Sequence, residues 1–408
     1  KEFTNSGHDV TVVSTSSLHY YSGMGPGMLS GIYRPDEIRF NVKKLSEDRG
    51  AAFVEDKVVK VMPDERKLEL QSGNQISYDA ISLNTGSFVP LAEPLRADKS
   101  VVTVKPIENL LNANRKIIEI LKTQDLKATV IGGGPTGVEV SGNLERLVRN
   151  ESGKCRITLV AATRLLPQFK AGVRQRVLKS LGGRNVQVME GVRMSAIKDG
   201  DVELSDGTVL KNDIIFMAIG VKPSRLFEDS GLPTGPDGGM LVNQFLQSVT
   251  HPEIFGGGDC ISFEPQPLAK VGVYAVRQNP ILLHNLLSIL NGHELQKFVP
   301  QKSILFGASA AVNIGIGRPA STMDEIIYAA RVCGVQQIIT AGGAQAVEPV
   351  AREIEHHPVA RAAREEAAVA RIVVKDWEGV GDEARALARH EAHASLLWNE
   401  WSGTEGED

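Results

Sequence analysis

A glycine motif in the middle of the chain restricts its fold more than any other feature. Gly132, Gly134 and Gly137 form the pattern GxGxxG, which follows an apolar run at 128–131 and precedes a helical pattern at 138–149. The first glycine permits a tight turn, the second lets backbone amides approach a pyrophosphate, and the third packs the helix against the strand. The amino end of the helix also favours phosphate groups. In this context the motif predicts a βαβ unit that binds a dinucleotide, with a purely structural turn as the alternative.

The remaining pattern alternates short apolar runs with helical stretches, which is typical of an α/β fold. Runs that predict strands lie at 10–13, 52–54, 57–61, 67–70, 80–83, 156–160, 186–189, 202–204 and 213–219. Apolar residues at helical spacing predict helices over 107–122 and 271–290. The segment 20–28 is predicted to be a loop, because it is too rich in glycine for the interior of a helix.

Composition excludes several classes of protein. The 408 residues suffice for two or three domains. The net charge of −4 does not indicate the excess of basic residues that is typical of nucleic-acid-binding proteins. No apolar run reaches the length of about 20 residues that a membrane-spanning helix needs. Cys155, Cys260 and Cys333 lie far apart in the sequence. This spacing argues against a disulfide framework or a local redox pair, and it fits a reducing, cytoplasmic compartment.

The residues after the glycine motif bear on the choice of coenzyme. About 20 residues beyond such a motif, an acid commonly binds the ribose 2′-hydroxyl of the dinucleotide. Ala161 stands at this place, and Arg164 follows three residues later. Without the acid, discrimination against a 2′-phosphate is lost, and Arg164 could pair with that phosphate. We therefore expect NADPH to be tolerated; the alternative is that Arg164 is merely an exposed side chain.

The glycine motif and two further motifs occur in a family-specific order. GGGPTGVE at 132–139, AIGVKP at 218–223 and IFGGGD at 254–259 follow one another along the chain. Thr85-Gly86-Ser87 follows a predicted strand, and the segment 20–24 is similar to a loop beside the flavin. Together these motifs resemble the pyridine-nucleotide–disulfide oxidoreductase superfamily over about residues 1–305, and within it the type II NADH dehydrogenases. The resemblance implies two Rossmann-like dinucleotide-binding domains, one for FAD and one for NAD(P).

The resemblance implies roles for residues around the nicotinamide coenzyme. Gly132, Gly134 and Gly137 would hold its pyrophosphate, and Glu139 would face its nicotinamide. Gly220 and Pro223, in the second motif, would lie against the same coenzyme.

The resemblance also implies an FAD site. Thr85 and Gly86 would form the crossing between the domains, and Gly258 and Asp259 would contact FAD, with Asp259 bonded to its ribityl or phosphate portion. A helix-capping or turn aspartate is the alternative for Asp259. Cys260 has no partner cysteine and is expected to be a small buried residue. Lys270, directly before the next helical segment, and Gln278, within it, either approach the flavin or acceptor or belong to a solvated face.

The predicted domain plan has three parts. Residues 1–104 and 235–305 form a discontinuous FAD-binding domain that lacks its first βα unit, and residues 105–234 form the NAD(P)-binding domain. Residues 306–408 form a mainly helical C-terminal extension that is unrelated or chimeric. Within it, residues 323–347 resemble a short stretch of histidinol dehydrogenase, but no zinc-site segment follows. The histidines are therefore expected to be surface residues, with no metal site: His356, His357, His390 and His393.

The predicted function is that of an FAD-dependent NAD(P)H dehydrogenase that passes electrons through flavin to a quinone-like or other small acceptor. The chain starts near the end of the helix that would follow a first GxGxxG, and Ser14 replaces the acid that usually ends the next strand. We therefore expect weak FAD binding. Peripheral membrane contact and a homodimer are compatible with this prediction. The alternatives are a non-catalytic dinucleotide-binding remnant without flavin and a histidinol-dehydrogenase-like fusion.

Overall fold

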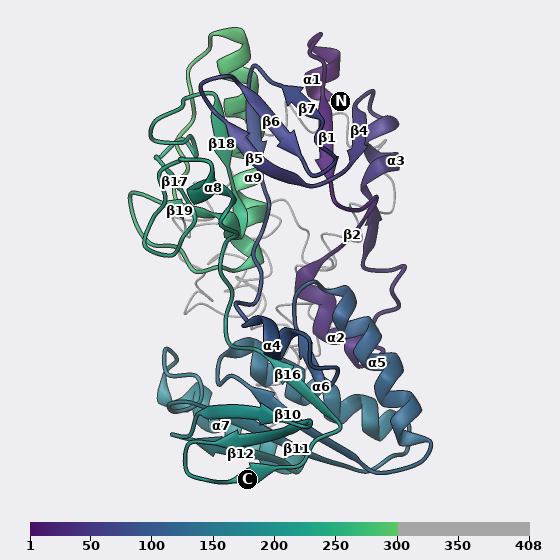
Figure 1. Ribbon diagram of the computed structural model, residues 1–408. Coiled ribbons are helices and arrows are strands. Elements are labelled where there is room, and N and C mark those ends of the chain that lie inside the picture. The colour runs from purple at the N-terminus through teal and green to yellow at the C-terminus, as the bar shows by residue number, and fades with distance from the viewer. Residues whose placement is uncertain (301–408) are drawn as a thin grey trace, which may run out of the picture. The chain divides into compact units, whose positions relative to one another are not determined.

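A five-stranded parallel sheet contains the strand that leads into the glycine motif (Figure 1). This strand, β10 (Leu126–Ile131), lies in the middle of the sheet. The other four are β11 (Cys155–Ala161) and β12 (Val186–Glu190) on one side, and β16 (Ile214–Met217) and β9 (Val101–Thr103) on the other. All four residues of β16 are buried, as expected for a strand in a parallel sheet that is covered on both faces.

Three helices pack beside this sheet. They are α5 (Glu108–Leu121), α6 (Pro135–Asn150) and α7 (Ala171–Gly183), and their buried positions recur at helical spacing. Helix α6 begins at Pro135, three residues before the predicted start. Proline suits the first helical position, because its fixed φ matches the helix and its missing N–H would have no partner there.

The computed structural model describes residues 1–300, which form one unit. The predicted extension at 306–408, the segment 323–347 and the four histidines therefore lie outside the described residues. A three-stranded antiparallel sheet also belongs to the described unit, with strands β13 (Met194–Lys198), β14 (Asp201–Leu204) and β15 (Val209–Leu210).

The remaining sheets have two or three strands each, and one of them joins strands from the two ends of the described sequence. β1 (Thr11–Ser14) pairs in parallel with β4 (Ala52–Glu55), and β8 (Ile81–Leu83) pairs in parallel with β18 (Ile254–Gly256). The other strands are β2 (Leu18–Tyr20) with β3 (Arg39–Asn41), β5 (Val58–Met62) with β6 (Lys67–Leu70) and β7 (Gln75–Ser77), and β17 (Met240–Val242) with β19 (Ile261–Phe263). The β8–β18 pair joins a strand that precedes the five-stranded sheet to one that follows it. The exact bounds of the two dinucleotide-binding domains stay a prediction.

The remaining helices are short, apart from α9 (Gly272–Asn291). They are α1 (Glu2–Asn5), α2 (Gly25–Leu29), α3 (Val42–Glu47), α4 (Glu93–Arg96) and α8 (Leu226–Asp229), with single 3₁₀ turns η1 (Ser22–Met24) and η2 (Gly258–Cys260). One apolar core lies between β5, β8, the strands β17–β19 and α9, and Phe227 and Phe255 are completely buried in it.

The prediction of a loop over 20–28 is wrong for its second half, where η1 and α2 are helical. Pro26 lies in the first turn of α2, a position that proline favours. Gly25 and Gly27 are both buried. A Cβ on Gly25 would lie 3.0 Å from Leu110 Cδ1, and one on Gly27 would lie 2.6 Å from the Tyr33 ring. Close packing against neighbouring side chains thus requires glycine here and outweighs its low helix propensity.

Candidate functional site: a glycine turn, a buried aspartate and a carboxyl of raised pKa

The turn between β10 and α6 can be built only from glycine at two positions. Gly132 has a φ of +135°, and a Cβ on it would lie 2.1 Å from the carbonyl oxygen of Ala218. A Cβ on Gly137 would lie 1.8 Å from the carbonyl oxygen of Gly132. Real side chains do not approach a backbone oxygen so closely. The first and last glycines of the motif therefore serve the tight turn and the close contact between helix and strand.

Gly134 is different, because nothing opposes its missing side chain. It is the N-cap of α6, its φ is −86°, and a Cβ there would meet no atom within 4 Å. Open space thus lies in front of the amino end of a 16-residue helix. Backbone N–H groups and the helix dipole make such a place favourable for phosphate. The turn fits the pyrophosphate of a dinucleotide, and this role of the glycines stays a prediction.

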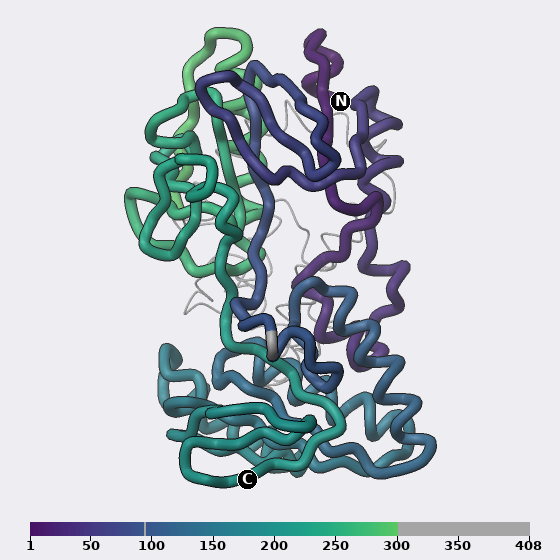
Figure 2. Tube along the Cα trace, in the orientation of Figure 1, coloured from purple at the N-terminus to yellow at the C-terminus, as the bar shows by residue number. Residues whose placement is uncertain are grey.

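Gly220 and Pro223 lie where the chain leaves the five-stranded sheet after β16. Gly220 is exposed and has a φ of +92°, whereas Pro223 is buried. Between them, Lys222 exchanges two backbone hydrogen bonds of 2.9 Å with Phe88. The segment after β8 and the segment after β16 therefore run side by side (Figure 2). This antiparallel pairing ties the crossing segment that begins at Thr85 and Gly86 to the segment that begins at Gly220.

Asp259 lies at the centre of a compact polar cluster. Its Oδ2 accepts hydrogen bonds from Ser87 Oγ at 2.6 Å and from Lys105 Nζ at 2.7 Å. Lys105 Nζ also lies 2.8 Å from Ser87 Oγ, so the three groups contact one another. The side chains of Asp259 and Lys105 are only 12% and 24% exposed. All the Asp259 contacts named here use Oδ2, so Oδ1 can still accept a bond from a ligand hydroxyl. This arrangement differs from the helix-capping alternative, since Asp259 lies inside η2, whose N-cap is Gly257, and its carboxylate bonds to side chains of distant segments.

The residues around Asp259 form a glycine-lined turn. Gly258 has a φ of +74° and Gly86 a φ of +67°, and a Cβ on Gly86 would meet no atom within 4 Å. The Gly258 amide donates to Gln278 Oε1 at 2.6 Å. Gln278 is 1% exposed, and its buried Nε2 has no hydrogen-bond partner among the described residues. An unpaired buried amide beside an open turn fits a site that receives a polar ligand such as FAD.

Two neighbours of this turn have structural roles. Cys260 is completely buried, as predicted, and burial raises the pKa of its thiol, while Thr85 partly offsets the effect by hydrogen bonding. Its Sγ donates to the carbonyl oxygens of Leu83 and Gly257 at 3.2 Å. Lys270 forms an ion pair of 2.6 Å with Asp237, and this contact helps to lower the pKa of the Asp237 carboxyl although burial acts against it. Lys270 therefore fixes a loop, and neither Lys270 nor Gln278 belongs to a freely solvated face.

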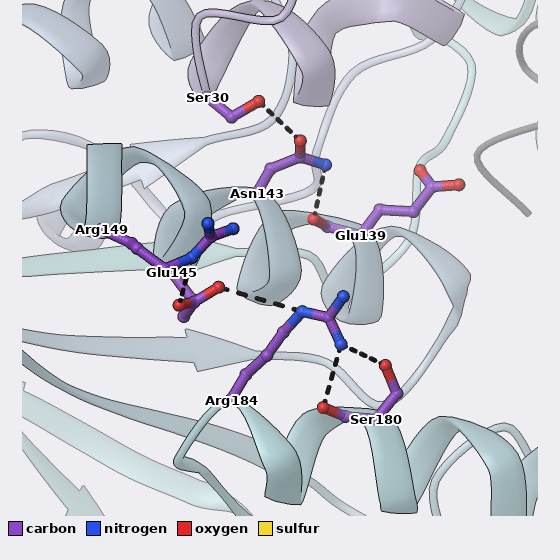
Figure 3. Close-up of polar contacts among 7 residues, drawn as sticks. All are labelled: Ser30, Glu139, Asn143, Glu145, Arg149, Ser180 and Arg184. Atoms are coloured by element: carbon purple, nitrogen blue, oxygen red, sulfur yellow. Dashed lines mark hydrogen bonds and ion pairs between the residues drawn. The ribbon is translucent and has the colours of Figure 1, made fainter. Parts of the chain in front are cut away.

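Glu139 lies in the second turn of α6. Part of its surface is exposed, yet the protein around it removes enough water to raise the pKa of its carboxyl from 4.5 to about 7. Figure 3 shows this carboxyl pointing away from the polar contacts that anchor the helix. In those contacts, Ser30 Oγ donates to Asn143 Oδ1 at 2.7 Å, and Asn143 Nδ2 donates to the Glu139 carbonyl at 3.0 Å. A carboxyl of this pKa can hold or release a proton near neutral pH.

Arg164 is exposed, and its guanidinium donates to the Pro167 carbonyl at 3.0 Å. Sequence reasoning named Ser87 within the motif at 85–87 without giving it a role, and it missed three other residues with which the site residues interact: Lys105, Asn143 and Glu190. A basic residue directly after the apolar run 101–104 was a signal for Lys105, but its contact with Asp259 is made across 154 residues of sequence.

Among residues 1–300, no three His, Cys, Asp or Glu side chains are grouped so that they could hold a metal ion. Within the same range, no helix has the length and apolar character needed to cross a membrane.

Comparison with known proteins connects this site to a family. The family model described as pyridine nucleotide-disulphide oxidoreductase matches residues 1–279. Ferroptosis suppressor protein 1 of Taeniopygia guttata is 26% identical over 283 residues, which cover 66% of this chain and 72% of that protein. A type II NADH:quinone oxidoreductase of Staphylococcus aureus is 24% identical over 365 residues, which cover 82% and 89%. A ferredoxin reductase from Rhodopseudomonas palustris matches in structure with a TM-score of 0.61 at 21% identity, over 72% of each chain. The predicted α/β fold is thereby confirmed.

Proposed function

Because the chain belongs to the pyridine nucleotide-disulphide oxidoreductase family, we propose that it passes electrons from NAD(P)H through FAD to a quinone-type acceptor. The family match and the NADH:quinone oxidoreductase relatives support a flavin-dependent NAD(P)H dehydrogenase. The enzyme class and the cofactors predicted from the sequence, FAD and NAD(P)H, are therefore confirmed. The individual site residues and the acceptor are part of the proposal.

The observation that supports it best is the glycine turn with its open helix end. Gly132 and Gly137 are required by close contacts to backbone oxygen, whereas Gly134 faces empty space at the start of α6. A structural turn alone would not need glycine at the middle position, because the φ of Gly134 is one that any residue adopts. A coenzyme pyrophosphate in front of α6 would explain the middle glycine, because the absence of a side chain there lets the pyrophosphate approach the backbone.

Residues of the chain would hold the FAD in place and would bind or release a proton during the reaction. Bound FAD would supply the redox chemistry, because it can accept a hydride from NAD(P)H and pass the electrons on. Asp259 would accept a hydrogen bond from a flavin ribityl hydroxyl through Oδ1 while Lys105 and Ser87 hold its Oδ2. Glu139 would hold or release a proton near pH 7, which suits an acceptor that takes up protons together with electrons.

A quinone-type acceptor is favoured over a disulfide. The two cysteines in the described part of the chain, Cys155 and Cys260, are free thiols. Both thiols have a raised pKa, that of Cys155 reaching about 11 mainly through burial, so neither favours the thiolate that exchanges disulfides. Relatives named as quinone oxidoreductases point to the same acceptor class. The homodimer, the peripheral membrane contact and the cytoplasmic location stay predictions.

The test is an anaerobic titration of the purified chain. Flavin absorbance should be present or restored by added FAD, and NADH or NADPH should bleach it. A soluble quinone should then restore the absorbance faster than an oxidised dithiol compound does. Flavin that is not bleached by either coenzyme would contradict the dehydrogenase function, and reoxidation by the disulfide alone would contradict the acceptor.

A further inference from the structure

A small pocket lies at the amino ends of β10 and β11, at the opposite end of β10 from the glycine turn. Its volume is about 180 Å³, and its lining includes three basic side chains and no acidic one: Lys127, Arg156 and Lys211. We propose that this pocket binds a phosphate group, either inorganic phosphate or the phosphate of a small phosphomonoester. The inference does not depend on the proposed function, since it uses no residue of the coenzyme or flavin site.

The pairing of β10 with β11 places two cations side by side. Lys127 and Arg156 are partners in the parallel register, and so are Thr129 and Thr158 two residues later. Side chains two residues apart lie on the same face of a sheet, so these four residues share one face. Lys127 and Arg156 are exposed, whereas Thr129 and Thr158 are 0% and 3% exposed. The pocket therefore has cations at its mouth and threonine side chains at its floor.

The two cations at the mouth lack a counter-charge. Within residues 1–300, neither the Lys127 nor the Arg156 side chain forms an ion pair or a hydrogen bond. Neighbouring strands lie about 4.8 Å apart, so like charges on partner residues repel one another. Lys211 differs, because it forms an ion pair with Asp201. A bound anion would relieve the repulsion between Lys127 and Arg156.

Hydrogen bonds hold the walls of the pocket together. The two carboxylate oxygens of Asp213, an acid beside the pocket, accept bonds from Gln124 Nε2 and from the Lys127 amide, both at 2.8 Å. The Asp213 amide donates to the Lys127 carbonyl at 2.8 Å, and Thr129 Oγ1 donates to Asn212 Oδ1 at 2.6 Å. The segment before β16 is thereby fixed against β10. The pocket is preorganised, which lowers the entropy cost of binding.

Thr158 supplies a buried donor at the floor of the pocket. Its side chain lines the pocket, yet its hydroxyl forms no hydrogen bond with any residue in the described part of the chain. Buried hydroxyls are normally paired, because an unpaired one has lost its bonds to water. An oxygen of a bound phosphate would accept this bond, while Lys127 and Arg156 donate from the mouth.

Size and charge restrict the class of ligand. Pockets for cofactors and drug-sized ligands measure about 300–1,000 Å³, so this pocket suits one ionic group and not a dinucleotide. Two cations favour phosphate, which carries up to two negative charges, over a carboxylate with one. Lys127 lies five residues before Gly132, or about 16 Å along an extended strand. The pocket is therefore separate from the glycine turn.

The experiment measures binding to the full-length purified protein by calorimetry at constant ionic strength, with inorganic phosphate, glycerol 1-phosphate and acetate as probes. Lys127→Gln and Arg156→Gln should each weaken phosphate binding by about tenfold or more. Thr158→Val, which removes only the hydroxyl donor, should weaken it by about threefold or more. Phosphate that binds at the glycine turn would be unaffected by these substitutions, so the differences between variants report on this pocket.

Arg193→Gln is the matched control. Arg193 is exposed, its side chain has no partner among the described residues, and it precedes β13, which is not adjacent to β15. This variant should bind phosphate like the native protein. Melting temperatures give a second readout: added phosphate should raise the native value more than that of Arg156→Gln. Without phosphate, Arg156→Gln should melt at or above the native temperature, because the repulsion with Lys127 is gone.

The probes also separate the two sources of phosphate. Glycerol 1-phosphate that binds at least as tightly as inorganic phosphate would assign the pocket to a phosphomonoester, and tighter binding of inorganic phosphate would assign it to the free ion. No phosphate binding by the native protein would overturn the inference, as would native affinity in both Lys127→Gln and Arg156→Gln. An equal loss in Arg193→Gln would show a non-specific effect of charge and overturn it as well. Acetate that binds as tightly as phosphate would refute the assignment to phosphate.

Discussion

Lys105 Nζ lies 2.7 Å from Asp259 Oδ2, although the two residues are 154 positions apart in the sequence. Lys105 follows β9 of the five-stranded sheet, and Asp259 lies in η2, directly after β18. Ser87 Oγ bonds to both groups and belongs to the crossing segment after β8. A single polar cluster thus connects three separate segments of the chain.

This ion pair predicts a clear stability effect. Lys105→Met leaves the Asp259 carboxylate partly buried without its cation, so the free energy of unfolding should fall by about 1–3 kcal/mol. Lys105→Met combined with Asp259→Asn should recover part of the loss, because no uncompensated charge remains. Urea unfolding, monitored by circular dichroism, measures the free energy of unfolding of the single and of the double variant.

Lys198→Met is the control for this experiment. It removes an ion pair with Glu203 whose side chains are 66% and 36% exposed, so it should cost at most about 0.5–1 kcal/mol. If Lys105→Met costs no more than this control, the Lys105–Asp259 pair does not stabilise the fold.

The glycine turn offers a comparison between two alanine substitutions. Gly137→Ala forces a Cβ against a backbone oxygen that cannot move aside cheaply. It should destabilise the protein by about 3 kcal/mol or more. Gly134→Ala meets no protein atom within 4 Å, so the melting temperature should stay close to the native value. Its methyl group would nevertheless occupy space in front of α6, and we expect about tenfold weaker NAD(P)H binding, or about 1.4 kcal/mol.

Calorimetric binding and thermal unfolding distinguish the two roles. A Gly134→Ala variant with native melting temperature and native coenzyme affinity would show that the pyrophosphate does not lie at this turn. A folded, stable Gly137→Ala variant would show that the helix can move away from the strand.

Local patterns predicted the central part of the fold. The strands β10, β11, β12 and β16 are rich in apolar, mostly β-branched residues, and the glycine spacing indicated the turn after β10. Both signals depend on residues near one another in sequence, so they can be recognised without the tertiary structure. The short strands β7, β13 and β15 were not predicted, since two to five residues in an antiparallel meander carry little periodic signal.

The site was predicted less completely. A motif marked Asp259 as a candidate, and Ser87 stood in the motif at 85–87, but the contacts of Asp259 with Ser87 and Lys105 are tertiary and no local pattern encodes them. Gln278 could not be distinguished from a solvated residue, because its burial depends on the turn at Gly257–Gly258 that packs against α9. The helix α2 was missed for the same reason: its stability comes from contacts with α5 and not from its own propensity.

The packing of α2 yields its own prediction. Gly27→Ala places a Cβ 2.6 Å from the Tyr33 ring, so the ring or the helix must shift. The free energy of unfolding should fall by about 1–3 kcal/mol, as in other overpacked sites. Gly182→Ala is the control: it lies in α7 with no atom near its missing Cβ, and should be neutral or stabilising by up to about 1 kcal/mol. A lower melting temperature for Gly27→Ala but not for Gly182→Ala supports the packing argument, and equal effects of the two substitutions contradict it.

The raised pKa of Glu139 predicts how stability depends on pH. The folded protein holds this proton up to about pH 7, whereas the ordinary value is 4.5. An acid with a raised folded pKa contributes its full stabilisation below the unfolded pKa, where both states are protonated, and this contribution is lost as the pH rises through the folded value. Native protein should therefore lose stability relative to Glu139→Gln between about pH 4.5 and 7, and the difference should become constant above that window. The loss will be smaller than for a wholly enclosed carboxyl, because Glu139 retains contact with solvent.

Melting temperatures of the native protein and of Glu139→Gln across the pH range test this prediction. Desolvation is the cause of the shift, so the window should stay in place when the salt concentration is raised; a shift caused by neighbouring charges would shrink as salt screens them. Activity should follow the same titration if the carboxyl handles a proton, with a change near pH 7 that Glu139→Gln abolishes. A pH-independent difference between the two proteins would mean that the pKa of the carboxyl is the same in the folded and the unfolded protein, and it would contradict a role for Glu139 in proton transfer near pH 7.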